Sequence, residues 1–270
     1  MQSEDRRVLA ALRGARREIV RAAEAFGVTL RAGGACFLFG AGTSGRLAVL
    51  EAAELPPTFG TDSKRVQAII AGGRPAMFRA REGAEDRYDD GRSRGGRARR
   101  GDLVIGVSAS SVTAFVRGAV ERARERGART VLVTASRSPG IEDVAEILVR
   151  LDTGPEVVAG STRLKAGTAT KLALNQITTS AFASSGKVFG PWMVDLRAGS
   201  AKLKDRARRI VAAATGSTPR KAQALLARAG GQVKTAIVMG RARLSAAEAR
   251  RRLKDSQGDL RTALEGRKNR

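Results

Sequence analysis

The stretch that most constrains the fold is residues 35–60, where an apolar segment runs into glycines and hydroxyls and then into a helical pattern. Residues 35–39 predict a buried strand, and residues 46–54 place apolar side chains at helical spacing. Between them lie Gly42, Thr43, Ser44 and Gly45. Backbone N–H groups and the helix dipole point out of a helix N-terminus, and glycine lets an anion approach closely. The turn therefore predicts a phosphate site.

This turn differs from the common nucleotide-binding loops. Residues 40–45, GAGTSG, have glycines at the spacing G-x-G-x-x-G, but hydroxyls stand at positions 43 and 44. No acidic residue ends a second strand at the distance typical of dinucleotide sites, and no Gly-Lys-Ser/Thr forms a Walker loop. Hydroxyls in place of a lysine favour a sugar phosphate over a nucleotide as the ligand.

Composition excludes several classes of chemistry. The chain has no histidine, which rules out Ser-His-Asp, Cys-His and histidine-ligated metal mechanisms, so carboxylates and lysines must carry any proton transfer. The single cysteine, Cys36, lies within the first apolar strand, as a core residue would.

The net charge of +24 attracts polyanions in general. However, the arginines are spread along the chain, and Tyr88 and Trp192 are the only Tyr and Trp available for base stacking. We therefore expect no specific nucleic-acid partner. No apolar run has the length of a membrane span and no signal peptide opens the sequence, so we expect a cytoplasmic protein with no membrane partner.

The order of the remaining patterns predicts an α/β fold. Strands alternate with helices, which indicates a parallel sheet covered by helices on both faces. Two prolines, Pro56 and Pro57, are expected to end the helix that follows the glycine turn, and the charged, glycine-rich residues 86–101 are expected to form a surface loop. The other expected strands are 66–71, 103–107, 130–134 and 146–151, and the other expected helices are 3–26, 76–85, 112–126 and 168–185.

From residue 201 the pattern is purely helical, with short segments near 218–229, 231–240 and 245–264. We therefore predict an N-terminal amphipathic helix (1–27), a sugar-phosphate domain (28–200) and a C-terminal helical module (201–270).

A second turn rich in hydroxyls follows the strand 103–107. In a parallel sheet the carboxyl ends of the strands meet at one edge, where ligands bind, so this turn and the glycine turn are expected to lie together. The hydroxyl residues of the second turn are Ser108, Ser110, Ser111 and Thr113.

Several long stretches resemble the sugar isomerase (SIS) fold and, within it, the N-acetylmuramic acid 6-phosphate etherases. The resemblance extends in order from residue 28 onward. The stretches that carry it are GAGTSGRLAVLEAAELPPTFG (40–60), AGG (71–73), REGAED (81–86), GPEVVAGSTRLKAGTATKLALN (154–175), GKVFGPWMVDL (186–196), KLKDRARRIV (202–211) and VKTAIVM (233–239).

The resemblance implies a cytoplasmic homodimer that cleaves the lactyl ether of N-acetylmuramic acid 6-phosphate, a phosphorylated amino sugar, during recycling of cell-wall sugars. Neither a metal nor an organic cofactor is implied. The implied mechanism is elimination followed by addition of water, with two carboxyl groups moving the protons. The C-terminal module is implied to resemble a ubiquitin-associated (UBA) three-helix bundle.

The resemblance also implies roles for individual residues. Glu54 in LEAAELPP matches the acid that protonates the lactyl oxygen, and Glu85 in REGAED matches the base at carbon two. Nearby acids that could be mistaken for them are Glu51, Glu82 and Asp86. The implied phosphate-binding residues are Gly42, Thr43, Ser44 and Gly45, with Ser110, Ser111 and Thr113 closing the other side.

The cations of GSTRLKAG have two interpretations. Arg163 and Lys165 could meet the phosphate or the lactate carboxylate of the substrate, from this subunit or its neighbour. A structural ion pair explains them equally well.

The chain departs from the family pattern in the second turn, where residues 108–114 read SASSVTA in place of A-A-S-G-R-T-P. It also begins at the amphipathic helix, where family members carry a further N-terminal segment. A third departure is residues 86–101, where an Arg/Gly-rich loop is expected in place of a helical segment of the family. The three departures predict weaker catalysis. They leave open a sugar-phosphate sensor without catalysis on the same fold, which the two retained glutamates oppose. A polyanion-binding protein is the third alternative and rests on charge alone.

Overall fold

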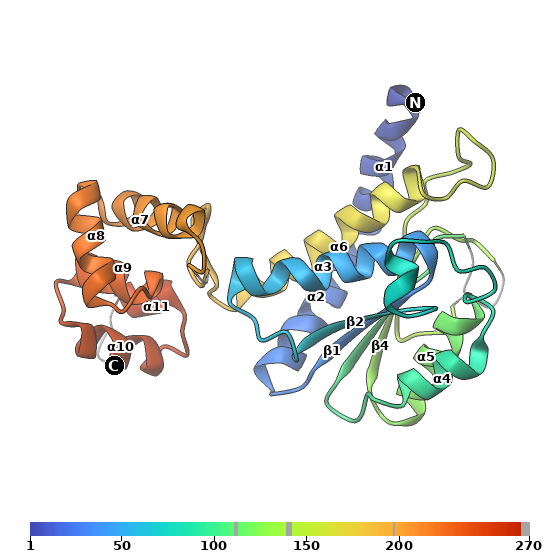
Figure 1. Cartoon of the computed structure of the whole chain (residues 1–270), viewed down its shortest axis with the longest axis horizontal. Helices are drawn as coiled ribbons and strands as arrows, with labels where there is room; N and C mark the ends of the chain where they lie inside the picture. The colour runs from blue at the N-terminus through green and yellow to red at the C-terminus, as the bar shows by residue number, and fades with distance from the viewer. Residues whose placement is uncertain (111–112, 139–141, 197, 266–270) are drawn as a thin grey trace. The chain divides into compact units, whose positions relative to one another are not determined.

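The computed structural model describes residues 1–110, 113–138, 142–196 and 198–265 (Figure 1). The chain divides into two compact units. The first comprises residues 1–53 and 62–181, and the second comprises residues 54–61 and 182–270. None of the described helices combines the length and the hydropathy that crossing a membrane requires.

The first unit is built on a sheet of five parallel strands in the order β2-β1-β3-β4-β5. All residues of β1 and β3 are buried, which explains their unbroken apolar sequences. The α/β class and the parallel sheet predicted from the sequence are confirmed. The strands are β1 (Cys36–Gly40), β2 (Val66–Ile70), β3 (Leu103–Val107), β4 (Arg129–Thr134) and β5 (Ile147–Arg150).

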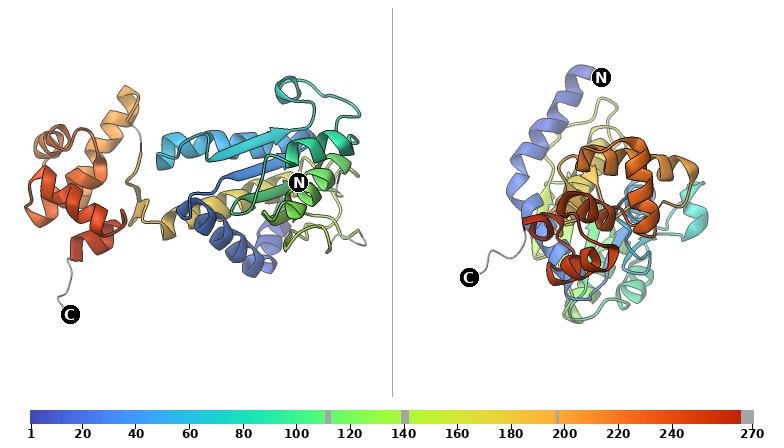
Figure 2. Two further views of the ribbon diagram at one scale, coloured as in Figure 1. Left: turned by 90° about the horizontal axis from the view of Figure 1, so that it is seen from below. Right: turned by 90° about the vertical axis from the view of Figure 1, so that its left-hand side faces the viewer.

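Helices cover both faces of this sheet (Figures 1 and 2). On one face α2 (Arg16–Arg31) contacts β1, β3 and β5, and α6 (Lys165–Ser184) runs beside it. On the other face α5 (Ala114–Glu125) packs its apolar residues on β1, β3 and β4, and α4 (Tyr88–Gly95) packs on α5. The apolar stripe of α5, which includes Phe115, Val116 and Val120, is therefore part of the core.

Two predicted boundaries near the N-terminus are wrong. The segment 3–26 is not one helix but two, α1 (Gln2–Gly14) and α2, and Gly27 lies buried inside α2 instead of ending it. The helix after the glycine turn, α3 (Gly42–Phe59), continues through both prolines. Proline has a φ suited to a helix, and in the last turn each one removes a single hydrogen bond.

Two further predictions, for the segment 76–101, are also wrong. No helix occupies 76–85: the 3-10 turn η1 (Arg74–Met77) is followed by turns, and Gly83 has a φ of 69°, which no α-helix accommodates. Residues 86–101 are not a solvated loop, because α4 lies within them and buries Gly91 and Gly95, and Ala98 is buried after it.

The second unit is helical apart from the hairpin of β6 (Val188–Phe189) and β7 (Trp192–Met193). Three of its helices begin at caps that the sequence provides: the Ser200, Thr218 and Ser245 hydroxyls accept N–H hydrogen bonds at the starts of α7, α8 and α10. The likeness to a UBA bundle stays a prediction. The helices are α7 (Ala201–Thr215), α8 (Pro219–Arg228), α9 (Val233–Ala242), α10 (Ala246–Asp255) and α11 (Leu260–Glu265).

Candidate functional site

The glycines of the first turn bring the end of β1 against the first turn of α3. A Cβ atom on Gly40 would lie 2.6 Å from the Gly45 nitrogen, and one on Gly45 would lie 2.7 Å from the Gly40 oxygen. Only glycine at both positions permits this approach. The turn is tight enough that α3 begins at Gly42, so Thr43 and Ser44 lie in its first turn, where N–H groups lack helical partners.

The second turn leaves β3 through a buried serine. Ser108 Oγ accepts a hydrogen bond of 3.2 Å from the Thr113 N–H at the start of α5. Thr113 Oγ1 is buried, and among the described residues it has no hydrogen-bond partner. An unsatisfied buried hydroxyl costs free energy, so a ligand atom that accepts from or donates to it would be favoured. Ser111 lies outside the described residues.

The two turns meet in a cavity of about 140 Å³. Because β1 and β3 are neighbours in a sheet of order 2-1-3-4-5, this is the place where the strand order reverses and ligands bind in such folds. Of the residues predicted from the sequence, the cavity is lined by Gly42, Thr43, Ser44, Glu85, Ser110 and Thr113. Gly45 is not among the lining residues; it permits the close approach of the turn to Gly40.

Glu85 reaches this cavity from a turn and not from a helix. Its carbonyl oxygen accepts a 2.9 Å hydrogen bond from the Phe115 N–H, which ties the turn to the start of α5. Glu85 is half-buried and lines the cavity, whereas Glu82 and Asp86 are exposed and do not line it. The geometry thus separates Glu85 from the two acids beside it.

The acids of α3 have different surroundings. Glu51 is only 7% exposed, and its carboxylate accepts a hydrogen bond from the Thr178 hydroxyl of α6. Glu51 therefore packs α3 against α6. Glu54 is exposed and is not among the residues that line the cavity. It falls in the segment 54–61 of the second unit.

The two cations of the GSTRLKAG segment do not line the cavity. Lys165 is fully buried, and its Nζ lies 2.5 Å from a carboxylate oxygen of Glu4 on α1. This hydrogen bond lowers the pKa of Glu4 below its ordinary value. Lys165 thus forms the structural ion pair that the sequence left open. Arg163 is exposed, and its role in binding stays a prediction.

Nearby, the start of α6 supplies wall residues that sequence reasoning missed. Glu156 caps this helix, because its carboxylate accepts 3.0 Å hydrogen bonds from the N–H groups of Lys165 and Ala166. Thr162 and Gly167 then line the cavity. The Ser, Thr and Gly residues of GSTRLKAG were the available signal in the sequence, whereas its two cations do not line the cavity.

A wider cavity of about 860 Å³ adjoins the first and shares Ser110 and Thr162 as walls. It lies at the ends of β4 and β5, where Ser136 and Ser138 hydrogen-bond to each other through hydroxyl oxygens 2.8 Å apart. These two serines lie in the segment that follows β4, and that position could have marked them in the sequence. In the part of the chain that the structure describes, no three His, Cys, Asp or Glu side chains gather as a metal site would require.

Comparisons with known proteins extend this picture. Residues 18–124 match the family described as the glucokinase regulatory protein N-terminal SIS domain. The structure of a phosphoheptose isomerase from Francisella tularensis superposes with a TM-score of 0.51 at 15% identity, over 67% of this chain and 94% of that chain. At this identity the similarity is one of fold.

Two curated relatives match nearly the whole chain. The N-acetylmuramic acid 6-phosphate etherase of Rubrobacter xylanophilus is 48% identical over 271 residues, covering 99% of this chain and 89% of the relative. That of Mycolicibacterium smegmatis is 45% identical over 268 residues, covering 98% of this chain and 89% of the relative. The resemblance seen in the motifs therefore holds across the full length.

Proposed function

The chain belongs to the family of N-acetylmuramic acid 6-phosphate etherases, and from this premise we propose how its residues carry out the reaction. It is a carbon–oxygen lyase that cleaves the D-lactyl ether of N-acetylmuramic acid 6-phosphate, giving N-acetylglucosamine 6-phosphate and D-lactate. The observation that supports our assignment of roles is the cavity between the ends of β1 and β3. It combines a helix N-terminus, hydroxyls and one carboxyl group.

The phosphate is proposed to bind at the start of α3. There the N–H groups of the first helical turn and the hydroxyls of Thr43 and Ser44 donate hydrogen bonds to phosphate oxygens. Across the cavity, Ser110 and the unpaired hydroxyl of Thr113 complete the shell. Loss of hydrogen bonds to a charged group costs roughly 1.5–3 kcal/mol each, so replacing Thr43 and Ser44 by alanine should raise KM by at least tenfold.

Glu85 is proposed to act as the base. In the opened sugar its carboxylate takes the proton from carbon two, which is acidified by the neighbouring aldehyde. The bond between carbon three and the lactyl oxygen then breaks, and Glu54 is proposed to protonate the departing oxygen. Water adds to the unsaturated intermediate as the proton transfers reverse. The half-buried position of Glu85 on the cavity wall supports its role; the role of Glu54 rests on the family motif alone.

Release of D-lactate from N-acetylmuramic acid 6-phosphate tests the assignment. Replacing Glu85 by glutamine should lower kcat by roughly 10²- to 10⁴-fold, the usual contribution of a positioned proton carrier. Glu82→Gln is the matched control, because it removes the same charge three residues away at an exposed position outside the cavity. Equal losses in both variants would contradict the role of Glu85, and sugar-phosphate binding without lactate release in the wild type would favour the sensor alternative.

The same test applies to Glu54 with a different control. Glu54→Gln should abolish protonation of the lactyl oxygen and lower kcat by a similar factor. Asp62→Asn, an exposed change shortly after the same helix, should leave kcat unaltered. An unchanged kcat in Glu54→Gln would remove Glu54 from the mechanism.

Dimerisation and a cytoplasmic location are proposed from the family resemblance. Light scattering coupled to size-exclusion chromatography should give twice the chain mass of 28.5 kDa. A mass equal to that of one chain would contradict the proposed dimerisation.

A further inference from the structure

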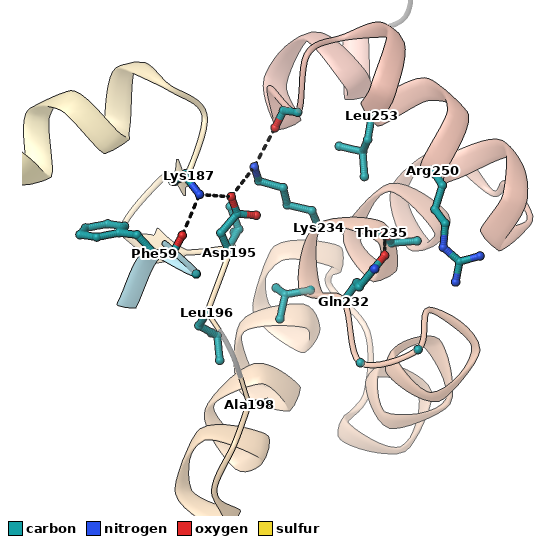
Figure 3. A pocket seen from close by; sticks show the side chains of 16 residues that line it. Phe59, Lys187, Asp195, Leu196, Ala198, Gln232, Lys234, Thr235, Arg250 and Leu253 are labelled. Carbon is teal, nitrogen blue, oxygen red and sulfur yellow. Dashed lines mark hydrogen bonds and ion pairs between the residues drawn. The ribbon is translucent and has the colours of Figure 1, made fainter. Parts of the chain in front are cut away.

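The second unit contains a cavity of its own, of about 730 Å³ (Figure 3). Every lining residue belongs to that unit, and none lines the cavity between β1 and β3. Its walls come from residues 59–60, the segment after β7, the start of α9 and one face of α10. The size is typical of a small-molecule site, and the proposed etherase mechanism does not use it.

The charged groups that line this cavity are unbalanced. Lys187, Lys234 and Arg250 are cationic, and Asp195 is the only acid among the lining residues, all of which the structure describes. Asp195 Oδ2 lies 3.2 Å from Lys187 Nζ and 3.0 Å from Lys234 Nζ, so one carboxylate oxygen serves two ammonium groups. The formal charge of the lining is therefore positive by two.

The other partners of the two lysines carry no charge. Lys187 donates a 2.8 Å hydrogen bond to the Phe59 carbonyl, and Lys234 donates one of 2.8 Å to the Gly258 carbonyl (Figure 3). The side chain of Lys234 is only 12% exposed. Burial lowers the pKa of Lys234 even though Asp195 acts in the opposite direction.

One further acid lies near this cluster without lining the cavity. The Asp259 carboxylate raises the pKa of Lys234 to a small extent, but it also accepts a 2.7 Å hydrogen bond from the Thr262 N–H and so caps α11. The Asp259 carboxylate therefore serves as a helix cap outside the cavity and leaves the surplus positive charge of the lining in place.

The start of α9 adds to the positive potential. Its N-cap residue, Gln232, makes no capping hydrogen bond, because its side-chain oxygen accepts from the Thr235 hydroxyl at 2.9 Å instead. Residues 230–235 line the cavity, so the positive end of the helix dipole faces it without a capping side chain. Arg250 lies at the same end, where its guanidinium donates to the Ala229 carbonyl.

We propose that this cavity binds a phosphate group, either free or carried by a small metabolite, through Lys187, Lys234, Arg250 and the start of α9. A phosphate brings close to two negative charges and three acceptor oxygens, which matches the two surplus charges and the several donors. A carboxylate would compensate only one of these charges. The apolar side chains of Val194, Leu196 and Leu253 leave room for the organic part of a phosphate ester.

Trp192 makes the test specific to this unit. It is the only tryptophan of the chain, it lies in β7 immediately before the lining segment, and it packs on the core of the second unit. Inorganic phosphate, glucose 6-phosphate and glucose are titrated in turn against the full chain, with chloride holding the ionic strength constant. We expect a saturable change in Trp192 fluorescence with the phosphate compounds and none with glucose. If glucose 6-phosphate binds more tightly, the site takes a phosphate ester; if inorganic phosphate binds more tightly, the site takes free phosphate.

Variants then separate this site from general attraction to a basic protein. Lys187→Gln, Lys234→Gln and Arg250→Gln should each weaken binding by tenfold or more. Arg251→Gln removes the same charge from an exposed neighbour outside the cavity and should leave the affinity unchanged. Circular dichroism identifies any variant that fails to fold, and Arg250, which is exposed, remains the safest substitution.

Three results would overturn the proposal. The first is the absence of a saturable response, and the second is an equal loss of affinity in Arg250→Gln and Arg251→Gln. The third is loss of the response when Thr43 and Ser44 are both replaced by alanine, because the signal would then come from the first unit. Retention of the response in that double variant, whatever its lactate release, supports the second site independently of the etherase mechanism.

Discussion

Gly45 packs the glycine turn after β1 against the neighbouring strand β2. A Cβ atom at this position would lie 2.5 Å from Ile70 Cγ1 and 2.7 Å from the Gly40 oxygen. Gly45→Ala should therefore destabilise the fold by roughly 1–3 kcal/mol, the usual cost of overpacking, and lower the melting temperature. Gly14→Ala is the control, because a Cβ there meets nothing within 4 Å. A melting temperature that falls equally in both variants would contradict this packing argument.

The ion pair of Glu4 and Lys165 should make stability depend on pH at the acid end. The Lys165 hydrogen bond lowers the pKa of Glu4 in the folded state. A lowered folded pKa gives a stabilising contribution that is complete above the unfolded pKa and is lost as the pH falls through the folded pKa. Wild type should therefore melt above Glu4→Gln at neutral pH, and the gap should close below about pH 4.

Asp5→Asn provides the comparison for this pH dependence. It removes one carboxylate from the next, exposed position of the same helix, so its effect on net charge is the same. Its melting temperature should follow that of the wild type across the pH range. A gap between wild type and Glu4→Gln that persists unchanged into acid would refute the contribution of the ion pair.

At the scale of elements, the closest packing in the first unit is between α4 and α5. A Cβ atom on Gly91 would lie 1.9 Å from the Phe115 oxygen, and one on Gly95 would lie 2.3 Å from the Ala119 oxygen. Gly91→Ala should force the two helices apart, with loss of stability and of lactate release. Activity is affected because Phe115 also holds the turn of Glu85 through its N–H group.

Ser93→Ala tests the same helix on its exposed side. It should leave both the melting temperature and kcat near the wild-type values. If Gly91→Ala lowered the melting temperature but left kcat intact, α4 would support the fold without positioning Glu85.

These same elements show what sequence could and could not predict. Buried parallel strands have continuous apolar sequences, so β1 and β3 were evident, and with them the two turns at their ends. α4 was not, because its close approach to α5 is made by glycines, and its charged side chains resemble those of a solvated loop. The available signal in the sequence was the pair Gly91 and Gly95, which are four residues apart and so lie on the same face of a helix.

The candidate site divides in the same way. Thr43, Ser44 and Thr113 could be placed from local pattern, because each lies between the end of a predicted strand and the first turn of the next predicted helix. The burial of Lys165 could not, because its partner Glu4 lies 161 residues away in the sequence. Pairing of side chains far apart in the sequence depends on how the elements pack, and local periodicity does not predict that packing.

At the scale of the whole molecule, the net charge of +24 should affect polyanions far more than the substrate. None of the described residues that line the cavity between β1 and β3 is lysine or arginine, although Arg7 and Arg137 line the wider cavity beside it. Phosphate binding through N–H groups and hydroxyls releases few counterions, whereas binding of DNA to surface arginines releases many.

Raising sodium chloride from 50 to 200 mM should accordingly weaken non-specific DNA binding by orders of magnitude and change the KM for the sugar phosphate by no more than a few fold. Both measurements use the same protein and the same buffers, so the salt dependence of DNA binding serves as the control for the salt dependence of KM. A KM that rose in parallel with the DNA dissociation constant would mean that surface arginines, and not the turns after β1 and β3, hold the phosphate. Because the proposed phosphate site offers neutral donors, we expect the two salt dependences to separate.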